Sequence, residues 1–276
     1  MLALTDLTEK LLDQLQHAPA VLVSVTRTQG SAPREAGAWM AVFAQGITGT
    51  IGGGQLEAQA IDHARTLLHD QTLAAGVQRH ALGPSLGQCC GGAVEVSFER
   101  IDRGDIHALR QRLQQDLPPV ALFGGGHVGH AIVRLLMTLP YSIFWIDSRD
   151  EVFAPDLPSR VRCEHSQPVQ AAVDDLPPGS KVLIMSFSHA EDLDVVSRCL
   201  MRLRRSDDLP FVGLLGSATK WAVFRRRLLA RGFTEAELAR ITCPIGLPGL
   251  TGKEPAVIAV AVAAQLLMQT RSAGSH

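Results

Sequence analysis

Two adjacent cysteines in a glycine-rich segment are the residues of this chain best suited to sulfur or metal chemistry. They are Cys89 and Cys90, in the sequence GQCCGG at residues 87–92. A disulfide between neighbours explains them poorly, because their Cα atoms lie about 3.8 Å apart across a trans peptide bond and disulfides usually span about 4.4–6.8 Å. A turn permitted by the glycines could instead expose one or both thiols. Burial of both as packing residues is the alternative, since free cysteine is among the most buried residue types.

A second candidate site is the segment GGGHVG at residues 124–129, which fits the pattern G-x-G-x-x-G. It follows an apolar run and opens a helical pattern, and Asp147 ends the next expected strand about 20 residues further on, which is the context of a dinucleotide-binding loop. Glycines allow close approach of a ligand, and a helix N-terminus offers free N–H groups to a phosphate. We therefore predict a phosphate-bearing ligand here. His127, in the first helical turn, is either a ligand contact or part of the helix cap.

Two later strand-to-helix turns carry further polar residues, in SFSH at 186–189 and GLLGSATK at 213–220. In open α/β sheets, ligands bind outside the carboxyl ends of the strands, so His189 is expected to face the same crevice as the glycine segment. Capping of the helix by Ser188, with a passive histidine, is the alternative. Ser217 could cap the next helix, and Lys220 could reach an anionic ligand or be an ordinary surface lysine.

The first half of the chain holds two weaker candidates for anion binding. Gly53 and Gly54, in GGGQLE at 52–57, open an expected helix and could form a second anion cradle. Arg34, in GSAPR at 30–34, could bind a phosphate bidentately. Local turn chemistry is the alternative for both.

The three remaining cysteines, Cys163, Cys199 and Cys243, stand in apolar contexts and are expected to be buried packing residues. Neither Cys-x-x-Cys pairs nor His-x3-His spacing occurs, so a structural zinc site is not expected.

The order of the helices and strands that must position these residues changes along the chain. Before residue 118, the patterns predict helices at 4–15, 55–69 and 106–115 and strands at 20–25, 39–43, 47–51, 77–82 and 93–98. Strands and helices mixed in this way indicate an α+β domain. From residue 118, strands at 120–123, 142–146, 161–163, 181–187 and 211–215 alternate with helices at 128–139, 189–203 and 218–230, before a last helix at 255–269. This alternation predicts a parallel sheet covered on both faces.

The expected fold class is therefore α/β, with a Rossmann-like doubly wound sheet and a smaller α+β domain before it. Residues 1–117 form the N-terminal domain, which carries the Cys89–Cys90 loop. Residues 118–270 form the Rossmann-like domain, and residues 271–276 are expected to be a disordered tail.

Composition excludes several classes of protein. Lys and Arg number 26 and Asp and Glu 27, so no positive excess points to nucleic acid. No apolar run reaches the roughly 20 residues of a membrane span, and Asp6 and Glu9 come too early for a signal peptide. Five irregularly spaced cysteines do not form a disulfide framework. We therefore expect a cytoplasmic protein with no nucleic-acid or membrane partner.

Taken together, the motifs resemble the XdhC/CoxI family. The segments that carry the resemblance are GSAPR at 30–34, GGG at 52–54 with Leu56 and Glu57, LGPSLGQCCGG at 82–92, FGGGHVG at 123–129, GLLGS at 213–217 with Lys220, PIGL at 244–247 and GKEP at 252–255. The cysteine-containing string and PIGL are specific, whereas the glycine fingerprint is not. Some relatives carry a cysteine where this chain has Gln55, so any sulfur chemistry here falls on the doublet.

The resemblance implies an accessory protein rather than an enzyme. Such a protein binds the molybdenum cofactor, supports its sulfuration with a cysteine desulfurase as the sulfur source, and delivers it to xanthine dehydrogenase. Cys89 or Cys90 would be a molybdenum ligand or sulfur relay, and the glycine loop would hold the phosphate of molybdopterin. The candidate cofactor-binding residues are Arg34, Gly53, Gly54, Cys89, Cys90, Gly124, Gly125, Gly126, His127, Gly129, Asp147, His189, Ser217 and Lys220.

Two other functions fit parts of the sequence. An NAD(P)-binding oxidoreductase would use the glycine fingerprint and Asp147, but it gives the cysteine doublet no role. A thiol redox or metal-chaperone module would use Cys89 and Cys90, although adjacent cysteines resist forming a reversible disulfide. A homodimer is common for soluble chains of this size, but no sequence feature marks an interface.

Overall fold

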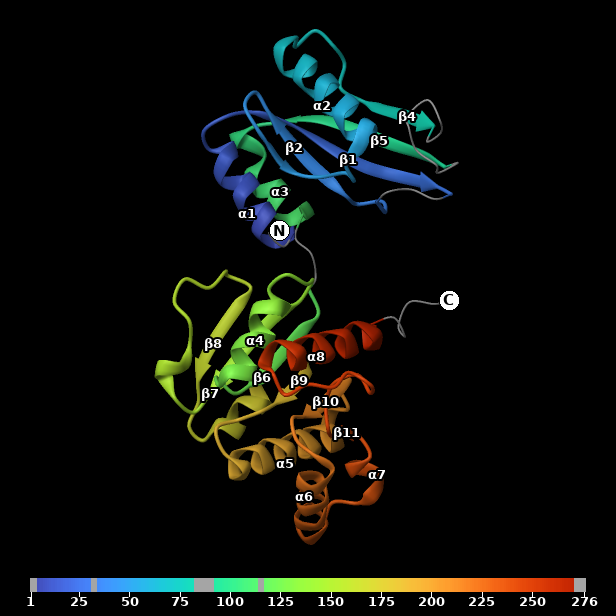
Figure 1. Ribbon diagram of the computed structural model, residues 1–276. Coiled ribbons are helices and arrows are strands. Elements are labelled where there is room, and N and C mark those ends of the chain that lie inside the picture. Colours follow the sequence, from blue (N-terminus) through green and yellow to red (C-terminus); the bar gives the residue numbers. More distant parts are fainter. Residues whose placement is uncertain (1–3, 31–33, 82–91, 114–116, 271–276) are drawn as a thin grey trace. The chain divides into compact units, whose positions relative to one another are not determined.

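The computed structural model describes residues 4–30, 34–81, 92–113 and 117–270 of the chain. The cysteine doublet at 89–90 and the tail at 271–276 lie outside these ranges. The chain divides into two compact units, Leu2–Gln115 and Asp116–His276 (Figure 1). Each unit is built around its own sheet.

The N-terminal unit contains a five-stranded antiparallel sheet with the order β3-β2-β1-β5-β4. Its strands are β1 (Ala20–Gln29), β2 (Trp39–Phe43), β3 (Ile47–Gly49), β4 (Val77–Ala81) and β5 (Ala93–Ile101). Alternate residues of β1 point to opposite faces, so Val21 and Val23 join one buried cluster while Ala20 and Leu22 join another. Both faces of this sheet are therefore covered.

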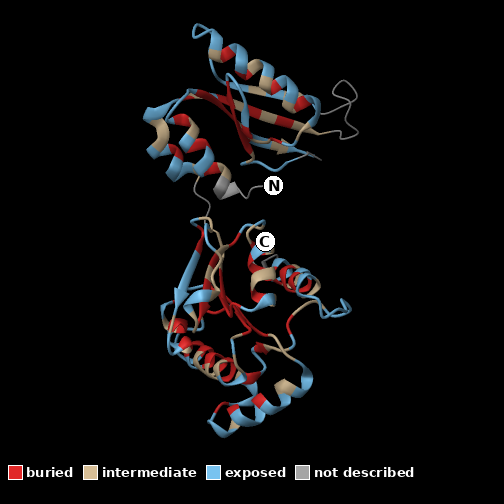
Figure 2. Ribbon diagram, turned by 60° about the vertical axis from the view of Figure 1, so that its left-hand side comes forward, coloured by how far each residue is buried: buried red, intermediate tan, exposed pale blue. Residues whose placement is uncertain are grey.

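Helices supply the two covers of this sheet (Figure 1). Helix α2 (Gly54–His69) packs Leu56, Ala60, Ala64 and Leu67 against one face. Helices α1 (Leu4–Leu15) and α3 (Ile106–Leu113), the second preceded by the short 3-10 helix η2 (Arg103–Asp105), cover the other face. Buried residues accordingly concentrate on the central strands (Figure 2).

The C-terminal unit contains a six-stranded sheet in which every pair of neighbouring strands is parallel. Its strands are β6 (Pro119–Phe123), β7 (Ser142–Asp147), β8 (Val161–His165), β9 (Lys181–Ile184), β10 (Phe211–Leu214) and β11 (Ile241–Thr242). The spatial order β8-β7-β6-β9-β10-β11 is the 3-2-1-4-5-6 order of a Rossmann fold. The predicted fold class is confirmed, and the strand order reverses between β6 and β9.

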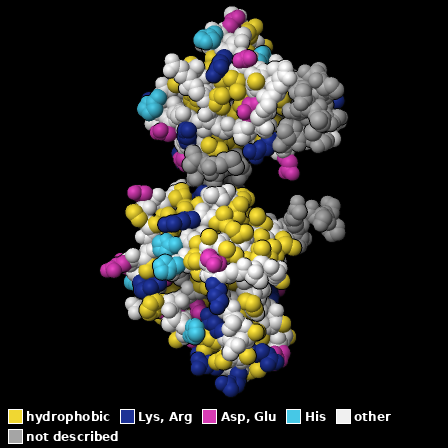
Figure 3. Space-filling view, viewed as in Figure 1, with side chains coloured by type: hydrophobic (Ala, Val, Ile, Leu, Met, Phe, Trp, Pro, Cys, Tyr) yellow, Lys and Arg dark blue, Asp and Glu magenta, His cyan; other side chains and the backbone are white. Residues whose placement is uncertain are grey.

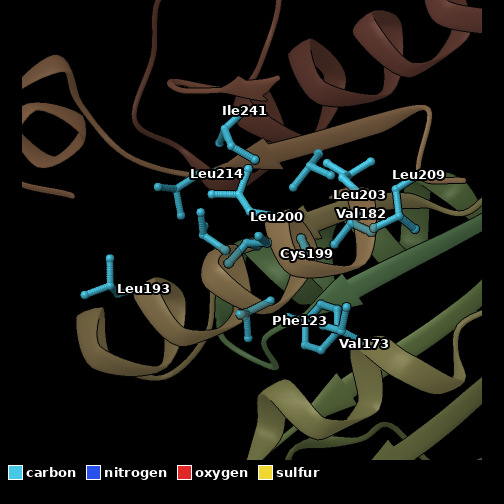
Figure 4. Close-up of a cluster of buried hydrophobic side chains, with 14 of the residues drawn as sticks. Phe123, Val173, Val182, Leu193, Cys199, Leu200, Leu203, Leu209, Leu214 and Ile241 are labelled. Atoms are coloured by element: carbon cyan, nitrogen blue, oxygen red, sulfur yellow. The ribbon is translucent and has the colours of Figure 1, made fainter. Parts of the chain in front are cut away.

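Helices cover both faces of the parallel sheet as well. Helices α4 (His127–Leu136) and α8 (Pro255–Thr270) pack together on one face. Helices α5 (His189–Ser206), α6 (Ala218–Ala230) and α7 (Glu235–Leu238), with the 3-10 helix η4 (Val169–Asp175), lie on the other. Figure 4 shows strand residues such as Val182 and Leu214 meeting Leu200 and Leu203 of α5.

Helix α8 differs from its neighbours because it contains no charged residue. It buries Ala259, Val262 and Leu266, yet it leaves Val260, Leu267 and Met268 exposed. Hydrophobic side chains gather over this helix in Figure 3. Within the described ranges, no helix is long and apolar enough to cross a membrane.

Some expected elements differ from the observed ones. The strand expected at 181–187 ends at Ile184, because the backbone N–H of Ser186 turns away to donate to the carboxylate of Asp192 (2.7 Å). The expectation that all three remaining cysteines are buried is wrong. Cys199 is buried, but Cys163 is exposed on β8, at the edge of the sheet, and Cys243 is half-buried.

Candidate functional site

The candidate site lies at the carboxyl edge of the parallel sheet, where the strand order reverses. The turn after β6 carries Gly124–Gly126, and the turn after β9 carries Ser186–Ser188. Strands β6 and β9 are hydrogen-bonded neighbours, so these two turns are adjacent at the edge of the sheet where ligands bind in folds of this class.

Close packing of the backbone explains two of the glycines. Gly124 has a φ of +129°, and a Cβ there would lie 2.0 Å from the carbonyl oxygen of Met185. A Cβ on Gly129 would lie 2.2 Å from the carbonyl oxygen of Gly124. The turn after β6 therefore packs so closely against the turn after β9, at Gly124, and against helix α4, at Gly129, that only glycine fits at these positions.

Gly126 faces open space instead. It is the N-cap residue of α4, and no side chain caps the start of this helix. A Cβ built on it meets no atom within 4 Å, and both Gly126 and His127 are exposed. The first N–H groups of α4 lack helical partners by geometry, so an anion can approach this end of the helix.

Asp147 closes the other side of the glycine turn. It is 1% exposed, and its Oδ2 accepts hydrogen bonds from the N–H of Gly125 (2.5 Å) and from Nη2 of Arg149 (3.0 Å). Its Oδ1 accepts from the backbone N–H and Nε of Arg149, both at 2.9 Å. Burial alone would raise the pKa of Asp147, but the hydrogen bonds from Arg149 and Gly125 outweigh it and lower the pKa. The carboxylate is thus ionised and fully engaged within the chain.

Arg149, which is half-buried, and Phe187, which is exposed, form a pair beside this turn, and the sequence did not single out either as a site residue. The Cζ of Arg149 lies 4.4 Å from the centroid of the Phe187 ring. Phe187 is 66% exposed. The signal that could have found the pair is an aromatic residue just past the end of a buried parallel strand, where packing does not require one.

Lys220 does not present a free charge to solvent. Its Nζ donates to Oδ2 of Asp192 (2.6 Å) and to the carbonyl oxygen of Leu215 (2.7 Å). Asp192, 2% exposed, also accepts from the N–H of Ser186. The ion pair therefore joins the turns after β9 and β10. The Oγ of Ser186 is buried and has no hydrogen-bond partner in the part of the chain that the structure describes.

The other residues expected at this edge serve mainly as helix starts. Ser188 caps α5 by accepting from the N–H of Glu191 (3.2 Å), and Ser217 caps α6 by accepting from the N–H of Lys220 (3.2 Å). His189 is exposed at the first position of α5, with its ring centroid 6.4 Å from that of Phe224.

The glycine turn of the N-terminal unit already holds a carboxylate. Oε2 of Glu57 accepts from the N–H groups of Ile51 (2.9 Å) and Gly53 (3.1 Å) and from the hydroxyl of Thr50 (2.5 Å). Gly53 and Gly54 have φ angles of +79° and +71°, which glycine adopts readily. This geometry favours local turn chemistry. Arg34 is exposed before β2.

Thiol chemistry is unfavourable at the cysteines that the structure describes. Burial raises the pKa of Cys163, raises that of Cys199 to about 12, and raises that of Cys243 to about 11. Because the thiolate is the nucleophile and the metal ligand, a raised pKa lowers the fraction of each of these thiols that can react or bind a metal near neutral pH. Within the described ranges, no group of three or more His, Cys, Asp or Glu side chains is placed to hold a metal ion.

Comparison with known proteins identifies related chains. Residues 120–266 match the family model described as the XdhC Rossmann domain, and residues 14–79 match the XdhC and CoxI family. The chain is 30% identical over 264 residues to the uncharacterized protein YqeB of Escherichia coli (strain K12). That match covers 94% of this chain and 45% of YqeB, so the chain spans less than half of that relative.

A solved structure shares the whole fold. A Bacillus halodurans protein described as a xanthine dehydrogenase superposes with a TM-score of 0.77, at 18% sequence identity, over 97% of both chains. At that identity the likeness shows a common fold of both units.

Proposed function

The chain belongs to the XdhC and CoxI family, and on that basis we propose that it is an accessory protein in the maturation of xanthine dehydrogenase. In this proposal it binds the molybdenum cofactor, supports its sulfuration by a cysteine desulfurase, and delivers it to the enzyme without turning over a metabolite itself. The observation that carries the proposal is the family match, which extends over both units.

The geometry of the glycine turn fits the phosphate end of molybdopterin. Gly126 leaves open space at the uncapped start of α4, and a helix N-terminus favours an anion through its free N–H groups and its dipole. The N–H of Gly125 is already held by Asp147, so the groups left for a phosphate are those of the first turn, at His127 and Val128. Gly126 itself has no side chain that could block the approach to them.

The sulfur end of the proposal rests on the cysteine doublet. Only a thiolate can ligate molybdenum or relay sulfur, and burial keeps the thiols of Cys199 and Cys243 protonated. Burial also raises the pKa of Cys163, whereas Cys89 and Cys90 stand in the glycine-rich segment that carries the family resemblance. We therefore assign the sulfur chemistry to one or both of them.

An NAD(P)-dependent oxidoreductase is less well supported. In such enzymes an acidic residue about 20 residues after the fingerprint binds a ribose hydroxyl. Asp147 occupies that place in the sequence, but it is buried and its oxygens accept from Gly125 and Arg149. Titration with NAD and NADP separates the two functions, because micromolar binding with hydride transfer would favour the oxidoreductase.

The test of the proposal is co-expression with the enzymes of cofactor biosynthesis. The purified chain should carry molybdenum together with a pterin, measured by metal analysis and by fluorescence of the released, oxidised pterin. It should also restore activity to xanthine dehydrogenase made without its cofactor. Absence of both molybdenum and pterin from the purified chain would refute the proposal.

Cysteine variants test the sulfur step separately. Cys89→Ser and Cys90→Ser, alone and together, should reduce activation of xanthine dehydrogenase by at least about tenfold in the double variant. Cys163→Ser is the matched control, because Cys163 is exposed but burial of its sulfur raises its pKa. Full activation by the double variant would show that the doublet is packing.

A further inference from the structure

We propose that Arg149 and Phe187 form a stacking platform for the ring system of the ligand, which we infer to present a planar nitrogen heterocycle and to carry a phosphate. This inference rests on the proposed function for its biological ligand, but its physical basis is separate. We call the pair of side chains the Arg149–Phe187 platform.

Exposure and position single out Phe187. It follows β9 at the point where the strand order reverses, and it is 66% exposed while the four residues of β9 are buried. Single exposed apolar residues need no special explanation, but this one is covered on one side by a guanidinium, 4.4 Å from its ring centroid. Flat guanidinium and aromatic groups are the surfaces on which nucleobase-like rings stack.

Hydrogen bonds hold the guanidinium of Arg149 and the backbone of Phe187 in place. Asp147 binds Arg149 at Nε (2.9 Å) and Nη2 (3.0 Å), which fixes the plane of the guanidinium. Glu191 accepts from the N–H of Phe187 (3.2 Å) and from the hydroxyl of Ser148 (2.8 Å), the residue before Arg149. Glu191 therefore ties together the two turns that carry the platform, and the guanidinium of Arg149 is already held in place before a ligand binds.

The platform is joined to the phosphate end of the site through one carboxylate. Oδ2 of Asp147 accepts from the N–H of Gly125 (2.5 Å) and from Nη2 of Arg149 (3.0 Å). The guanidinium and the glycine turn are thus separated by a single oxygen atom. A ligand whose phosphate meets the start of α4 has the platform next to it.

The distribution of charge determines that the ring of the ligand binds at the platform and its phosphate at the start of α4. Asp147 balances the charge of Arg149, so the platform attracts a flat ring by stacking and not by net charge. The start of α4 has no side-chain cap, and its dipole favours the anionic end. Pterin phosphates and purine nucleotides share this chemistry, and an experiment must distinguish them.

The test compares aromatic and aliphatic residues at one exposed position. Phe187→Leu keeps the apolar surface and removes the π face, whereas Phe187→Tyr keeps it. Because Phe187 is 66% exposed, neither change should alter the melting temperature. We expect Phe187→Leu to lower pterin occupancy after co-expression by about tenfold, the order of effect seen when a stacking side chain is removed, and Phe187→Tyr to stay within about twofold of the parent.

Controls and a second probe make the outcome unambiguous. Met268→Leu, at a 60% exposed apolar position of α8, should change nothing. AMP and GMP are titrated alongside ribose 5-phosphate, which has no ring to stack, and only the nucleotides should lose affinity in Phe187→Leu. A loss limited to pterin occupancy assigns the platform to the cofactor, and a loss limited to AMP or GMP assigns it to a nucleotide; both support stacking.

Failure of this inference differs from failure of the proposed function. If the parent chain carries pterin and Phe187→Leu carries as much, with unchanged affinity for AMP and GMP, the platform is refuted and the cofactor role stands. If the parent chain carries no pterin but loses nucleotide affinity on Phe187→Leu, the cofactor role is refuted and the platform stands. If Phe187→Leu weakens the binding of ribose 5-phosphate as much as that of AMP and GMP, the substitution does not act through stacking. That result would also overturn the inference.

Discussion

At the scale of single residues, two carboxylates accept hydrogen bonds from N–H groups that the glycine turns would otherwise offer to a ligand. Glu57 accepts from Ile51 and Gly53 in the N-terminal unit, and Asp147 accepts from Gly125 in the C-terminal unit. A carboxylate that receives several N–H groups stabilises the turn around it. Both residues therefore shape the loops that were expected to bind anions directly.

Asp147→Asn should destabilise the C-terminal unit by about 1–3 kcal/mol at pH 7, since hydrogen bonds to charged groups contribute on that order. The pKa of Asp147 is lowered in the folded chain, so its contribution is present above the unfolded value near 3.8 and is lost as the pH falls through the folded pKa. Denaturant unfolding should be measured from pH 7 to pH 3 for the parent chain and for Asp147→Asn. The difference between their free energies of unfolding should stay constant down to about pH 4 and become smaller below it. A difference that widens on acidification would contradict this account.

His80 should make the N-terminal unit less stable in mild acid. Its Nε2 is buried without a hydrogen-bond partner in the described ranges, and burial, together with the charge of His63, lowers its pKa. The unfolded chain then binds the proton more readily, so stability falls as the pH drops below about 6.5, by at most about 1.4 kcal/mol per pH unit.

The measurement is denaturant unfolding of His80→Gln between pH 5 and pH 8. This variant cannot titrate at the position and should show a flatter profile than the parent chain. His17→Gln, at an exposed histidine of the same unit, should keep the parent profile. Parallel profiles for all three proteins would refute the role given to His80.

At the scale of elements, the glycines set how closely β6 and α4 approach. Gly129→Ala would place a Cβ 2.2 Å from the carbonyl oxygen of Gly124, whereas Gly126→Ala meets no atom within 4 Å. Overpacking of this kind costs about 1–3 kcal/mol, so thermal unfolding should show Gly129→Ala to be clearly less stable than Gly126→Ala. Gly126→Ala should instead weaken phosphate binding, because its methyl group occupies the open approach to α4. Equal stability of the two variants would refute this division.

The ion pair between Lys220 and Asp192 connects α5 and α6 from within. Their side chains are 13% and 3% exposed, and removing one partner of a buried pair costs about 3–5 kcal/mol because the other is left unpaired. Lys220→Ala should therefore cost about 2–4 kcal/mol after allowance for the partial exposure of the lysine. Arg231→Ala breaks an exposed pair between the C-cap residue of α6 and Asp194 of α5, and should cost under about 1 kcal/mol. Similar losses in the two variants, by denaturant unfolding, would contradict this contrast.

The sequence predicted the helices and strands better than the contacts between side chains. Apolar runs such as 120–123 and the helix starts at Ser188 and Ser217 are local patterns, and the structure contains the elements that they predict. The two-residue strand β11 and the short helix α7 are too brief to leave a periodic signal. The spatial strand order also depends on which helix covers which face, so the alternation of strands and helices could not fix it.

Side-chain partnerships account for most of what the sequence did not predict at the site. The spacing of Asp147 suggested a contact with ribose, but its oxygens are engaged by an arginine two residues later and by the glycine turn. Lys220 looked free on its helix, but a buried aspartate from α5 holds it. These contacts join residues from separate turns, and no pattern along the chain encodes them.

At the scale of the whole molecule, each unit has the requirements of an independent domain. Each contains a sheet with a buried cluster on both faces, and each is compact by its own contacts. A unit with its own core can fold alone. The features assigned to phosphate binding and ring stacking, including Gly126, Arg149 and Phe187, all belong to the C-terminal unit.

A fragment covering residues 116–276 should therefore fold and bind, but it should not relay sulfur. It should unfold cooperatively by circular dichroism and keep the affinity of the full chain for a purine nucleotide within about threefold, because every group of the platform is present. It contains Cys163, Cys199 and Cys243 but not the doublet, and burial raises the pKa of each of these three thiols. Incubation with a cysteine desulfurase and cysteine should accordingly leave no persulfide on the fragment by mass spectrometry, while the full chain gains one at Cys89 or Cys90. A persulfide on the fragment would move the sulfur chemistry into the Rossmann unit, and loss of nucleotide affinity in a well-folded fragment would show that the binding site needs residues from the first 115.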